Sequence, residues 1–565
     1  MTTDGDDFDA LLSILGYGRW QVPGVVVTLL VASQIPAQLV GSPLLCGPVP
    51  FRCSRETPEV VTRLNSSTYF SNECFSPTSL PSDAITQPSN STDLFLSNGT
   101  RPQRTGMESC PVIEYDTSIF TSTIISEFHL VCERESLQPL FQMMYTVGII
   151  FGSLFGGYIG DKWGRRRAVQ GGVVVYVAVV LAMAFVPSFV FVLVMRVMVG
   201  VTHQCMLIPV WSLALESTPT RHRSLVGMLL GLPYSLFVIV LAGVGYFVRT
   251  WKYLMLVCCA PALALLPLSF IMDESARWLI QQKRREEARK VLRKAVRQNK
   301  AKLPVPLETI IGNLDQVYDS EYLQRECVAE DNQSAARKAL KEAWEYLRSP
   351  AMRTIILVTP ILWFLQSCLY LAVAINANNF NSSNPFLYVC LSGAMDASAI
   401  LLVTPLTTRL GRRVIVGAGL FVGGIFFLLD LLVPIGYFWA KWILVMAGFL
   451  LVAGSFQMNY VYGPELFPTE ARTRGFAFIS LIGGMGSMIA PIITYKLALL
   501  TWWAAPVTFG CAGLLGSLTL PLLPETRNQP MPDTLKDVDD RRLRRKIKSA
   551  NLGKENQAYE NTNDI

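Results

Sequence analysis

Four ionisable side chains stand inside otherwise apolar stretches of the sequence: Asp396, Arg196, His203 and Asp430. A charged side chain at the centre of a lipid-embedded helix costs about 3 kcal/mol or more unless it faces a wet interior or a partner. Asp396 has no cation one helical turn further on, because Ile400 stands there. We therefore expect Asp396 to attract an ammonium group. The alternative is an acid that serine and backbone groups satisfy at a helix contact.

The other three ionisable groups have more than one interpretation. Arg196 could pair with an acid such as Asp396, or it could meet the carboxylate of a zwitterion. His203 lies two turns after Arg196 and changes its charge near physiological pH, so it could carry protons, although a lone helical histidine is more often a hydrogen-bond partner. Asp430 lies near the end of its apolar run, where it could reach lipid headgroups, and we interpret it as structural.

Aromatic rings offer a second kind of chemistry, because a desolvated ring face binds an organic cation with about 0.5 to 2 kcal/mol. Three- and four-residue spacings place one set on a single helix face: Trp363, Phe364, Ser367 and Tyr370. Polar Gln366 and Ser367 would be wasted on lipid, which favours an interior face. Any single aromatic residue is more often a packing group. Further candidates for the same site are Trp211, Tyr234 and Gln457.

The composition indicates that lipid is the solvent for much of the chain. Hydrophobic residues make up 51% of the 565 residues, and charged residues only 16%. Crossing a hydrocarbon core takes about 20 helical residues, and only helices and closed barrels satisfy every backbone group there. Strand-like alternation is absent from the sequence. We predict twelve transmembrane helices, at 20-42, 140-160, 168-187, 189-212, 225-247, 253-272, 353-375, 386-408, 413-434, 439-462, 475-498 and 503-523.

The positive charges of the short loops predict the topology. Eleven lysine and arginine residues lie in the loops at 160-167, 217-224, 409-413 and 465-474, and four lie in the alternating loops. Cytoplasmic loops carry the excess of positive charge, so we expect the first set in the cytoplasm, together with both termini. The net charge of +7 follows from this asymmetry and needs no nucleic-acid partner.

The long loop at 43-139 is then expected on the outer side of the membrane. It contains three N-glycosylation sequons, at Asn65, Asn90 and Asn98. Cysteines in an oxidising compartment usually pair, so we expect two disulfides and one cysteine left over, without a pairing that the spacing can decide. The five cysteines are Cys46, Cys53, Cys74, Cys110 and Cys132. The same loop could support a homo-oligomer.

The sequence contains an internal repeat. The pattern E-x-x-P-T-x-x-R begins at Glu216 and again at Glu465, which is 249 residues later. Two further matches lie at nearly the same offset: Gly164-Arg165-Arg166 with Gly411-Arg412-Arg413, and Glu274-Ser275-Ala276-Arg277 with Glu525-Thr526-Arg527. Three matches in register predict a duplicated six-helix unit whose two copies have the same orientation.

The repeated motifs place cations beside acids at the cytoplasmic ends of the helices. Arg165 and Arg166 have Glu216 as a natural partner. Arg412 and Arg413 have Glu465. We interpret these pairs as a gate that forms when the helix ends close and separates when they open, since topology alone needs cations but not the repeated glutamates. The alternative is that the arginines only fix the topology. The remaining members of the predicted gate are Asp161, Arg223 and Arg472.

These inferences divide the chain into five parts. They are a cytoplasmic N-terminus (1-19), an N-terminal six-helix bundle (20-272) that includes the outer loop (43-139), a cytoplasmic connector (273-352), a C-terminal six-helix bundle (353-523) and a cytoplasmic tail (524-565). The connector is polar, with mixed-sign charges at helical spacing, and we expect it to lie across the helix ends as a latch.

The motifs resemble those of solute carrier family 22, the organic ion transporters of the major facilitator superfamily. The resemblance extends over nearly the whole chain, through the outer loop and the segments at 157-166, 273-279, 465-469 and 523-527. It implies an all-α membrane protein with twelve transmembrane helices in two pseudo-symmetric bundles of six. It also implies a place in the plasma membrane and the movement of organic cations, zwitterions or anions through a cavity between the two bundles.

Two positions depart from the patterns of that family. The resemblance implies an aspartate or an arginine seven residues before a proline in helix eleven, whereas this sequence has Gly484 before Pro491. In helix eight, the anion carriers have a lysine four residues after the acid, and here Asp396 is followed by Ile400. The resemblance therefore does not settle the charge of the substrate.

We predict a multi-pass transporter that takes up organic cations by alternating access, driven by the membrane potential. A zwitterion (carnitine-like) or organic anion transporter of the same family is the first alternative, and a transporter-like receptor or scaffold is an alternative of another class. The expected partners are a small organic ion and the lipid bilayer. The sequence shows no clustered metal ligands and no paired nucleophile and base, so we predict no enzymatic activity, no cofactor and no metal.

Overall fold

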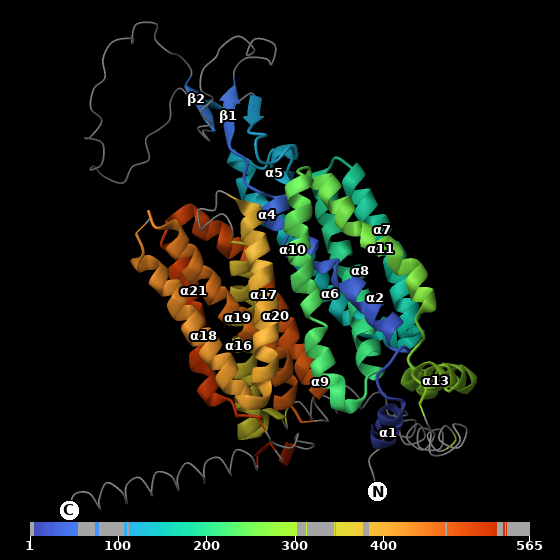
Figure 1. Ribbon diagram of the computed structural model, residues 1–565. Coiled ribbons are helices and arrows are strands. Elements are labelled where there is room, and N and C mark those ends of the chain that lie inside the picture. Colours follow the sequence, from blue (N-terminus) through green and yellow to red (C-terminus); the bar gives the residue numbers. More distant parts are fainter. Residues whose placement is uncertain are drawn as a thin grey trace, which may run out of the picture. The chain divides into compact units, whose positions relative to one another are not determined.

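The computed structural model describes residues 5–54, 74–77, 107–109, 112–301, 312, 344, 346–376, 384–434, 436–468, 472–527, 535–536 and 538–539. Helices dominate this part of the chain (Figure 1). Among the described residues, twelve helical segments are long and apolar enough to cross a membrane. The prediction of twelve helical spans is therefore confirmed, and each segment overlaps one of the predicted ranges.

Six of these spans lie in the first half of the chain, and two of the six consist of two helices each. The second helix of each broken span has a proline at its start, Pro36 in one and Pro233 in the other. Proline lacks the N–H that would continue the preceding helix, and its ring clashes with the preceding turn. The six spans are α2 (Val22–Ala32) with α3 (Ile35–Leu39), α6 (Gln138–Trp163), α7 (Arg165–Phe185), α8 (Phe189–Glu216), α9 (Thr220–Leu229) with α10 (Leu232–Phe247), and α11 (Trp251–Ile271).

The second half supplies the other six spans. Two of them begin with an N-cap side chain followed by proline: Ser349 Oγ accepts from the N–H of Met352, and Asn384 Oδ1 accepts from the N–H of Leu387. Such caps satisfy donors that the first helical turn leaves open. The six helices are α16 (Pro350–Ala374), α17 (Pro385–Arg409), α18 (Arg412–Leu429) with η3 (Asp430–Leu432), α19 (Phe438–Leu466), α20 (Arg472–Leu500), and α21 (Ala504–Thr519) with η4 (Leu520–Leu522).

Glycine brings helices of the same half into backbone contact. A Cβ atom on Gly148 of α6 would lie 2.2 Å from the carbonyl oxygen of Val197 on α8, and one on Gly486 of α20 would lie 2.4 Å from that of Phe364 on α16. No side chain fits at such distances. Small residues of this kind are the usual contact residues of membrane helices.

The two halves meet where α10 lies beside α17 (Figure 1). A Cβ atom on Gly393 of α17 would lie 3.0 Å from the carbonyl oxygen of Ser235 on α10. A second contact joins α6 to α20, because a Cβ atom on Gly484 would lie 3.0 Å from the side chain of Ile150. The position that departs from the family pattern, Gly484, is thus a point of close approach between the halves.

Three further helices, which belong to the same compact unit as the twelve spans, pack together through an apolar cluster. They are α1 (Gly5–Leu15), α12 (Ala276–Gln281) and α13 (Arg285–Asn299). The cluster contains Phe8, Leu11 and Leu12 of α1 with Leu279 of α12 and Leu292 of α13. On α13, the apolar residues recur at three- and four-residue intervals, which is the pattern of a helix with one buried face. The start of the predicted connector is therefore helical and bound to the N-terminus.

Residues Leu45–Gln138 and Arg249–Trp251 form a second compact unit. It contains two antiparallel strand pairs, β1 (Phe51–Ser54) with β4 (Val112–Tyr115) and β2 (Phe75–Pro77) with β3 (Met107–Ser109), besides α5 (Ile124–Glu127) and η2 (Cys132–Leu137). The short helix α4 (Ser42–Leu45) precedes it.

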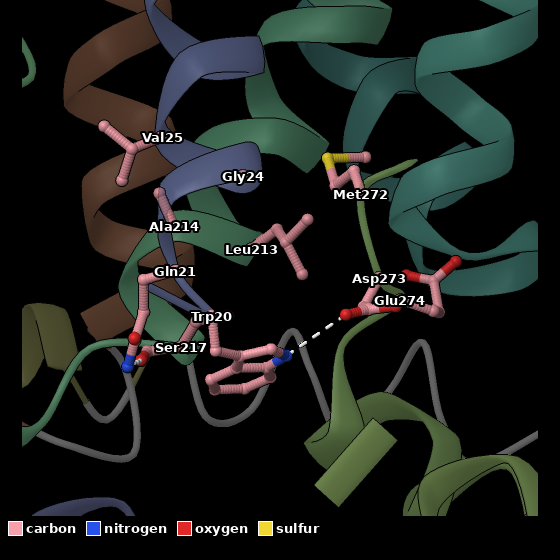
Figure 2. Close-up of a pocket in the computed structure, with 10 residues that line it drawn as sticks. All are labelled: Trp20, Gln21, Gly24, Val25, Leu213, Ala214, Ser217, Met272, Asp273 and Glu274. Atoms are coloured by element: carbon pink, nitrogen blue, oxygen red, sulfur yellow. Dashed lines mark hydrogen bonds between the residues drawn. The ribbon is translucent and has the colours of Figure 1, made fainter. Parts of the chain in front are cut away.

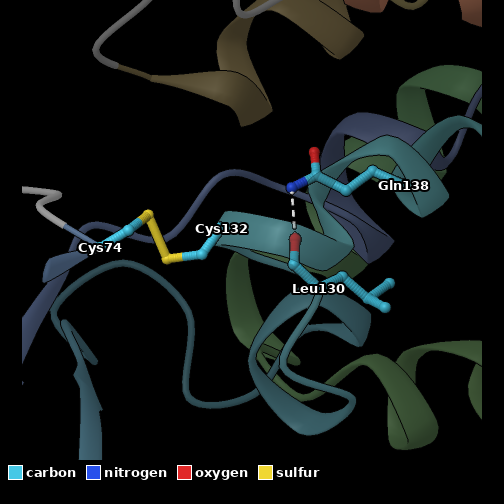
Figure 3. Close-up of a disulfide and its surroundings, with 4 residues drawn as sticks. All are labelled: Cys74, Leu130, Cys132 and Gln138. Carbon is cyan, nitrogen blue, oxygen red and sulfur yellow. Dashed lines mark hydrogen bonds between the residues drawn. A yellow bond between two sulfur atoms is a disulfide. The ribbon is translucent and has the colours of Figure 1, made fainter. Parts of the chain in front are cut away.

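A disulfide joins Cys74 to Cys132, close to a hydrogen bond from Gln138 Nε2 to the Leu130 carbonyl oxygen (Figure 3). Cys53 is also disulfide-bonded, and its partner lies outside the described residues. Three of the five cysteines are thus disulfide-bonded, which agrees with the expectation of two disulfides. The three predicted glycosylation sites, Asn65, Asn90 and Asn98, lie outside the described residues.

Candidate functional site

Asp396 lies on α17 at the contact with α10 and is only 2% exposed. The hydroxyl of Ser235 on α10 donates a hydrogen bond to its Oδ2. Its Oδ1 makes no hydrogen bond of normal geometry with any residue that the structure describes. A buried carboxylate with an oxygen that lacks a well-aligned donor is energetically costly.

Two tyrosines face this carboxylate. The hydroxyl of Tyr370 on α16 lies within hydrogen-bonding reach of the carboxylate, and that of Tyr234 on α10 interacts electrostatically with both groups. The ring of Tyr370 stacks on Phe456 and Phe449 of α19, with centroid separations of 4.5 and 5.6 Å. The structure thus brings three of the predicted site residues together beside aromatic walls.

Trp363, two turns before Tyr370 on α16, belongs to a second group of rings. Its indole meets Tyr460 and Phe476 edge to face, with centroids 5.2 and 5.7 Å apart. Tyr460 in turn meets Phe456 at 5.4 Å, so the two groups form one continuous series of rings. The Trp363 Nε1–H has no acceptor within the described ranges, although the residue is only 3% exposed.

Gln366, another predicted site residue, is occupied by helix contacts. Asn459 Nδ2 donates to Gln366 Oε1, and Gln366 Nε2 donates to Ser455 Oγ at 2.8 Å. Ser455 Oγ continues the chain to the Val416 carbonyl oxygen at 2.9 Å. These bonds tie α16 to α19 and α18. The expectation that Gln366 faces the interior holds, but its amide already has partners from this network.

The remaining predicted substrate contacts lie around these groups. Ser367 is buried, with its Oγ 2.9 Å from the place that a Cβ on Gly483 would take. Phe364 and Trp211 are half-buried on α16 and α8. Gln457 on α19 reaches across to the other half, because its Oε1 would lie 3.6 Å from a Cβ on Gly231.

Arg196 is completely buried in the first half and bonded to neutral oxygens. Its guanidinium donates to Gln38 Oε1 and to the Gln38 carbonyl at 2.5 and 2.9 Å, to the Phe141 carbonyl at 3.1 Å and to Gln142 Oε1 at 3.3 Å. The guanidinium carbon also lies 4.0 Å from the centroid of the Phe141 ring. These acceptors, and not Asp396, surround the charge.

His203 lies in the same buried region. The Tyr145 hydroxyl is 3.3 Å from its Nδ1, and the Val31 carbonyl oxygen is 3.4 Å from its Nε2. Both ring nitrogens therefore have partners from the first half, which fits a hydrogen-bonded packing residue.

Asp430 forms an ion pair with Lys441, whose Nζ lies 3.8 Å from its Oδ2. Lys441 also lies over the ring of Trp502, 5.3 Å from the centroid. The acid closes a contact between η3 and α19, as the structural interpretation expects.

A cluster of charges closes one end of the first half. Arg165 Nη2 lies 3.1 Å from Glu216 Oε1 and 3.0 Å from Asp161 Oδ1. The side chains of Arg165 and Glu216 are 10% and 19% exposed, whereas that of Asp161 is 74% exposed. Arg166 instead donates to the carbonyl oxygens of Ser269 and Phe270 at the end of α11. The predicted partnership of Arg165 with Glu216 is present in the structure, and Glu216 and Asp161 both neutralise that cation.

The second half repeats this cluster in a weaker form. Arg412 Nε lies 3.5 Å from Glu465 Oε2, which also accepts from Thr526 Oγ1 at 2.5 Å. Arg472 interacts electrostatically with Glu465. Arg413 donates to the Leu523 carbonyl oxygen at 3.4 Å. Arg223 lies on α9, but its side chain is outside the part that the structure describes. Both ion pairs join helices within one half.

Two acids complete these clusters that were not among the predicted site residues. Glu274 accepts hydrogen bonds from the N–H groups of Arg165 and Arg166, at 2.9 and 3.1 Å, and so caps α7. Glu525 accepts from those of Arg412 and Arg413, at 2.8 and 3.2 Å, and so caps α18. The signal was present in the sequence, because both acids belong to the third repeated motif.

Burial raises the pKa of the Glu274 carboxyl above its ordinary value of 4.5, against the opposing effect of the N–H groups of Ser275, Arg166 and Arg165. A carboxylate at the N-terminus of a helix is also stabilised by the helix dipole. Glu274 is therefore a buried acid that the first turn of α7 holds in place.

Comparisons with known proteins agree with this architecture. The family model described as "Sugar (and other) transporter" matches residues 83–534. "Solute carrier family 22 member 6" of Danio rerio is 32% identical over 436 residues, which are 76% of this chain and 74% of that protein. The "Organic cation transporter protein" of Drosophila melanogaster is 29% identical over 445 residues, 78% of this chain and 79% of that protein.

The solved structures show the same fold. An inward-open conformation of the xylose transporter XylE from E. coli covers 72% of this chain and 89% of its own, with a TM-score of 0.54 and 17% sequence identity. Another XylE structure is described as a member of the major facilitator superfamily. The fold is thus that of major facilitator transporters, with two bundles of six helices. The chain belongs to the sugar and other transporter family and, within it, to solute carrier family 22.

Proposed function

We propose that the protein moves organic ions across the plasma membrane by alternating access, and that organic cations such as amines or quaternary ammonium compounds are its preferred substrates. The observation that carries this proposal is the buried Asp396 between the two halves, whose Oδ1 has no hydrogen bond of normal geometry among the described residues. The name of the Drosophila relative, an organic cation transporter protein, supports the same substrate class.

The chemistry around Asp396 suits a positively charged solute. A hydrogen bond to a charged group contributes about 1.5 to 3 kcal/mol, and a desolvated ring face contributes about 0.5 to 2 kcal/mol to the binding of a cation. Tyr370 interacts electrostatically with the carboxylate, and its ring belongs to the continuous aromatic series. An amine would complete Oδ1 by donating a hydrogen bond, and a quaternary ammonium would use the charge and the rings.

The hydrogen bonds of Arg196 argue against a zwitterion or an anion as the substrate. Its guanidinium already donates to the oxygens of Gln38, Phe141 and Gln142. A substrate carboxylate would have to displace these bonds inside the first half. The distribution of bonds therefore favours cations.

Potential-driven entry follows from this choice of substrate. With the Arg-rich helix ends in the cytoplasm, an inside-negative potential favours the entry of each positive charge by about 2.3 kcal/mol per 100 mV. No coupled ion is required for such uptake.

The charge clusters at the helix ends take part in the proposed transport cycle. Because each ion pair joins helices of one half, each half is stiffened at its cytoplasmic end. We expect the halves to rock against each other at the α10–α17 contact, and each ion pair to form when the cytoplasmic helix ends close and to separate when they open.

Uptake of a labelled quaternary ammonium into expressing cells, beside a carnitine-like zwitterion and an organic anion, tests the proposal. We expect saturable cation uptake that falls on depolarisation and is strongly reduced in Asp396→Asn. Asp430→Asn is the matched control, because that acid pairs with Lys441. Uptake of only the zwitterion or the anion contradicts the cation preference. Binding without uptake indicates a receptor.

A further inference from the structure

Asn299, the last residue of α13, closes a tight turn between α1 and α2. Its Oδ1 accepts a hydrogen bond from the N–H of Trp20 at 3.0 Å. Its Nδ2 lies 3.1 Å from Gln21 Oε1 and 3.3 Å from the carbonyl oxygens of both Leu15 and Gly16. One amide thus reaches four groups of a single turn. We call residues 15–21 together with Asn299 the N-terminal clasp.

The clasp contacts both sides of the charge cluster of the first half. Trp20 Nε1 donates to Asp273 Oδ2 at 3.2 Å, beside Glu274 (Figure 2). Lys294 of α13 holds the same carboxylate, with its Nζ 2.8 Å from Asp273. Gln21 Nε2 donates at 3.2 Å to the carbonyl oxygen of Ser217, the residue that follows Glu216.

The remaining space between these groups is small. A cavity of about 20 Å³ lies among Trp20, Gln21, Ser217, Asp273 and Glu274, which is room for about one water molecule (Figure 2). A displacement of Trp20 or Gln21 therefore has to be passed on to the loop at 273–274 or to the end of α8, because there is little room to absorb it.

We propose that the N-terminal clasp is a positioning element for the transport cycle, with Asn299 as its central residue. By holding Asp273, the clasp fixes the adjacent Glu274, which caps α7 and so places Arg165 against Glu216. The effect on transport rests on the proposed function, whereas the effect on the cap of α7 does not. The clasp acts on the first half only.

Gly18 allows the clasp to be opened without removing any of its bonding groups. A Cβ atom at this position would lie 2.6 Å from Asn299 Oδ1, so Gly18→Ala must push the amide aside. The amide is the end of a flexible side chain, which makes this shift compatible with folding. Gly24→Ala is the matched control, because no heavy atom lies within 4 Å of a Cβ there.

The test measures transport and backbone protection in the full-length protein. We expect Gly18→Ala and Asn299→Ala to lower the turnover per surface molecule about three- to tenfold, as the loss of one or two hydrogen bonds would, with little change in KM. The double variant should be no worse than Asn299→Ala, because both act on one contact. Gly24→Ala should match the wild type.

Amide hydrogen exchange measures the protection that Glu274 gives to the first turn of α7, and this measurement does not depend on the substrate. The N–H groups of Arg165 and Arg166 should exchange faster in Gly18→Ala, and those of Arg412 and Arg413, their counterparts in the other half, should not. Unchanged exchange at Arg165 and Arg166 overturns the inference whether or not cations are carried. A loss of uptake explained by fewer molecules at the surface, with turnover unchanged, also overturns it. If the wild type moves no cation but exchange responds as expected, the proposed function fails and the clasp stands.

Discussion

Neutralising Glu216 should have a larger effect than neutralising its counterpart Glu465. In Glu216→Gln, the guanidinium of Arg165, which is 10% exposed, keeps the 74% exposed Asp161 as an ion-pair partner and still interacts electrostatically with Glu274. Removing one partner from a fully buried pair costs about 3 to 5 kcal/mol, and from an exposed pair about 0 to 1 kcal/mol. The partial exposure of this pair sets the expected cost at about 1 to 2 kcal/mol.

Glu465→Gln should cost less, for two reasons that can be read from the geometry. The Arg412–Glu465 separation is 3.5 Å, against 3.1 Å for the first pair. A glutamine at position 465 can still accept the hydrogen bond from Thr526. We therefore expect a cost below about 1 kcal/mol for this change.

Thermal melting of the purified variants and their net uptake rates measure the difference. A loss of 1 to 2 kcal/mol in one conformation changes the balance between conformations about 5- to 30-fold, which should appear in the turnover of Glu216→Gln. Its melting temperature should also fall by a few degrees. If Glu465→Gln has an equal or larger effect on both quantities, the assignment of strength from burial and distance is wrong.

Three further predictions concern single side chains. Trp363→Phe should cost less than about 1.5 kcal/mol of unfolding free energy, because the indole N–H of Trp363 has no acceptor among the described residues. Trp363→Ala should cost about 3 to 5 kcal/mol, because it leaves a cavity. Melting curves that rank the two variants in the opposite order would contradict this packing. Cys74→Ser removes the disulfide to Cys132, which closes a loop of 58 residues, and should lower the stability of the unit Leu45–Gln138 by about 4 kcal/mol. Proteolysis of this unit should become faster. An unchanged cleavage rate would refute the prediction. The pKa of the Glu274 carboxyl is raised in the folded state, so this group stabilises the fold below pH 4.5, and that stabilisation is lost as the pH rises through the folded pKa. On acidification, the melting temperature of the wild type should therefore rise relative to that of Glu274→Gln. A relative fall would contradict the raised pKa.

Much of the architecture follows from local sequence patterns. Runs of apolar residues predict the twelve spans because lipid forces each backbone group to find a partner within its own helix. The three repeated motifs predict the duplication, and the charge clusters of the two halves show it again in space: Arg165 with Glu216 corresponds to Arg412 with Glu465.

The partners of buried polar groups could not be predicted in the same way. Gln38 and the Phe141 carbonyl reach Arg196 from two other helices, and no periodicity in the sequence announces such a contact. Ser235 is likewise 161 residues from Asp396 and meets it only because α10 packs on α17. Contacts of this kind depend on how whole helices are rotated, which a single sequence does not specify.

The aromatic cluster on α16 was predicted in part. The spacing on α16 placed Trp363 and Tyr370 correctly on an interior face, but the rings that pack on them come from α19 and α20. Phe456 and Tyr460 are four residues apart on α19, so the same spacing rule could have found them. Phe449 lies seven residues before Phe456 on that face. Phe476, near the start of α20, carries no such signal.

The central claim is that the carboxylate of Asp396 recognises positive charge. Its most direct test compares the inhibition constants of a quaternary ammonium ligand and of its uncharged carbon isostere, in the wild type and in Asp396→Asn. We predict that the wild type prefers the cation by at least about tenfold, which is about 1.4 kcal/mol, and that the variant shows little preference. An equal preference for the cation in both proteins would contradict the claim.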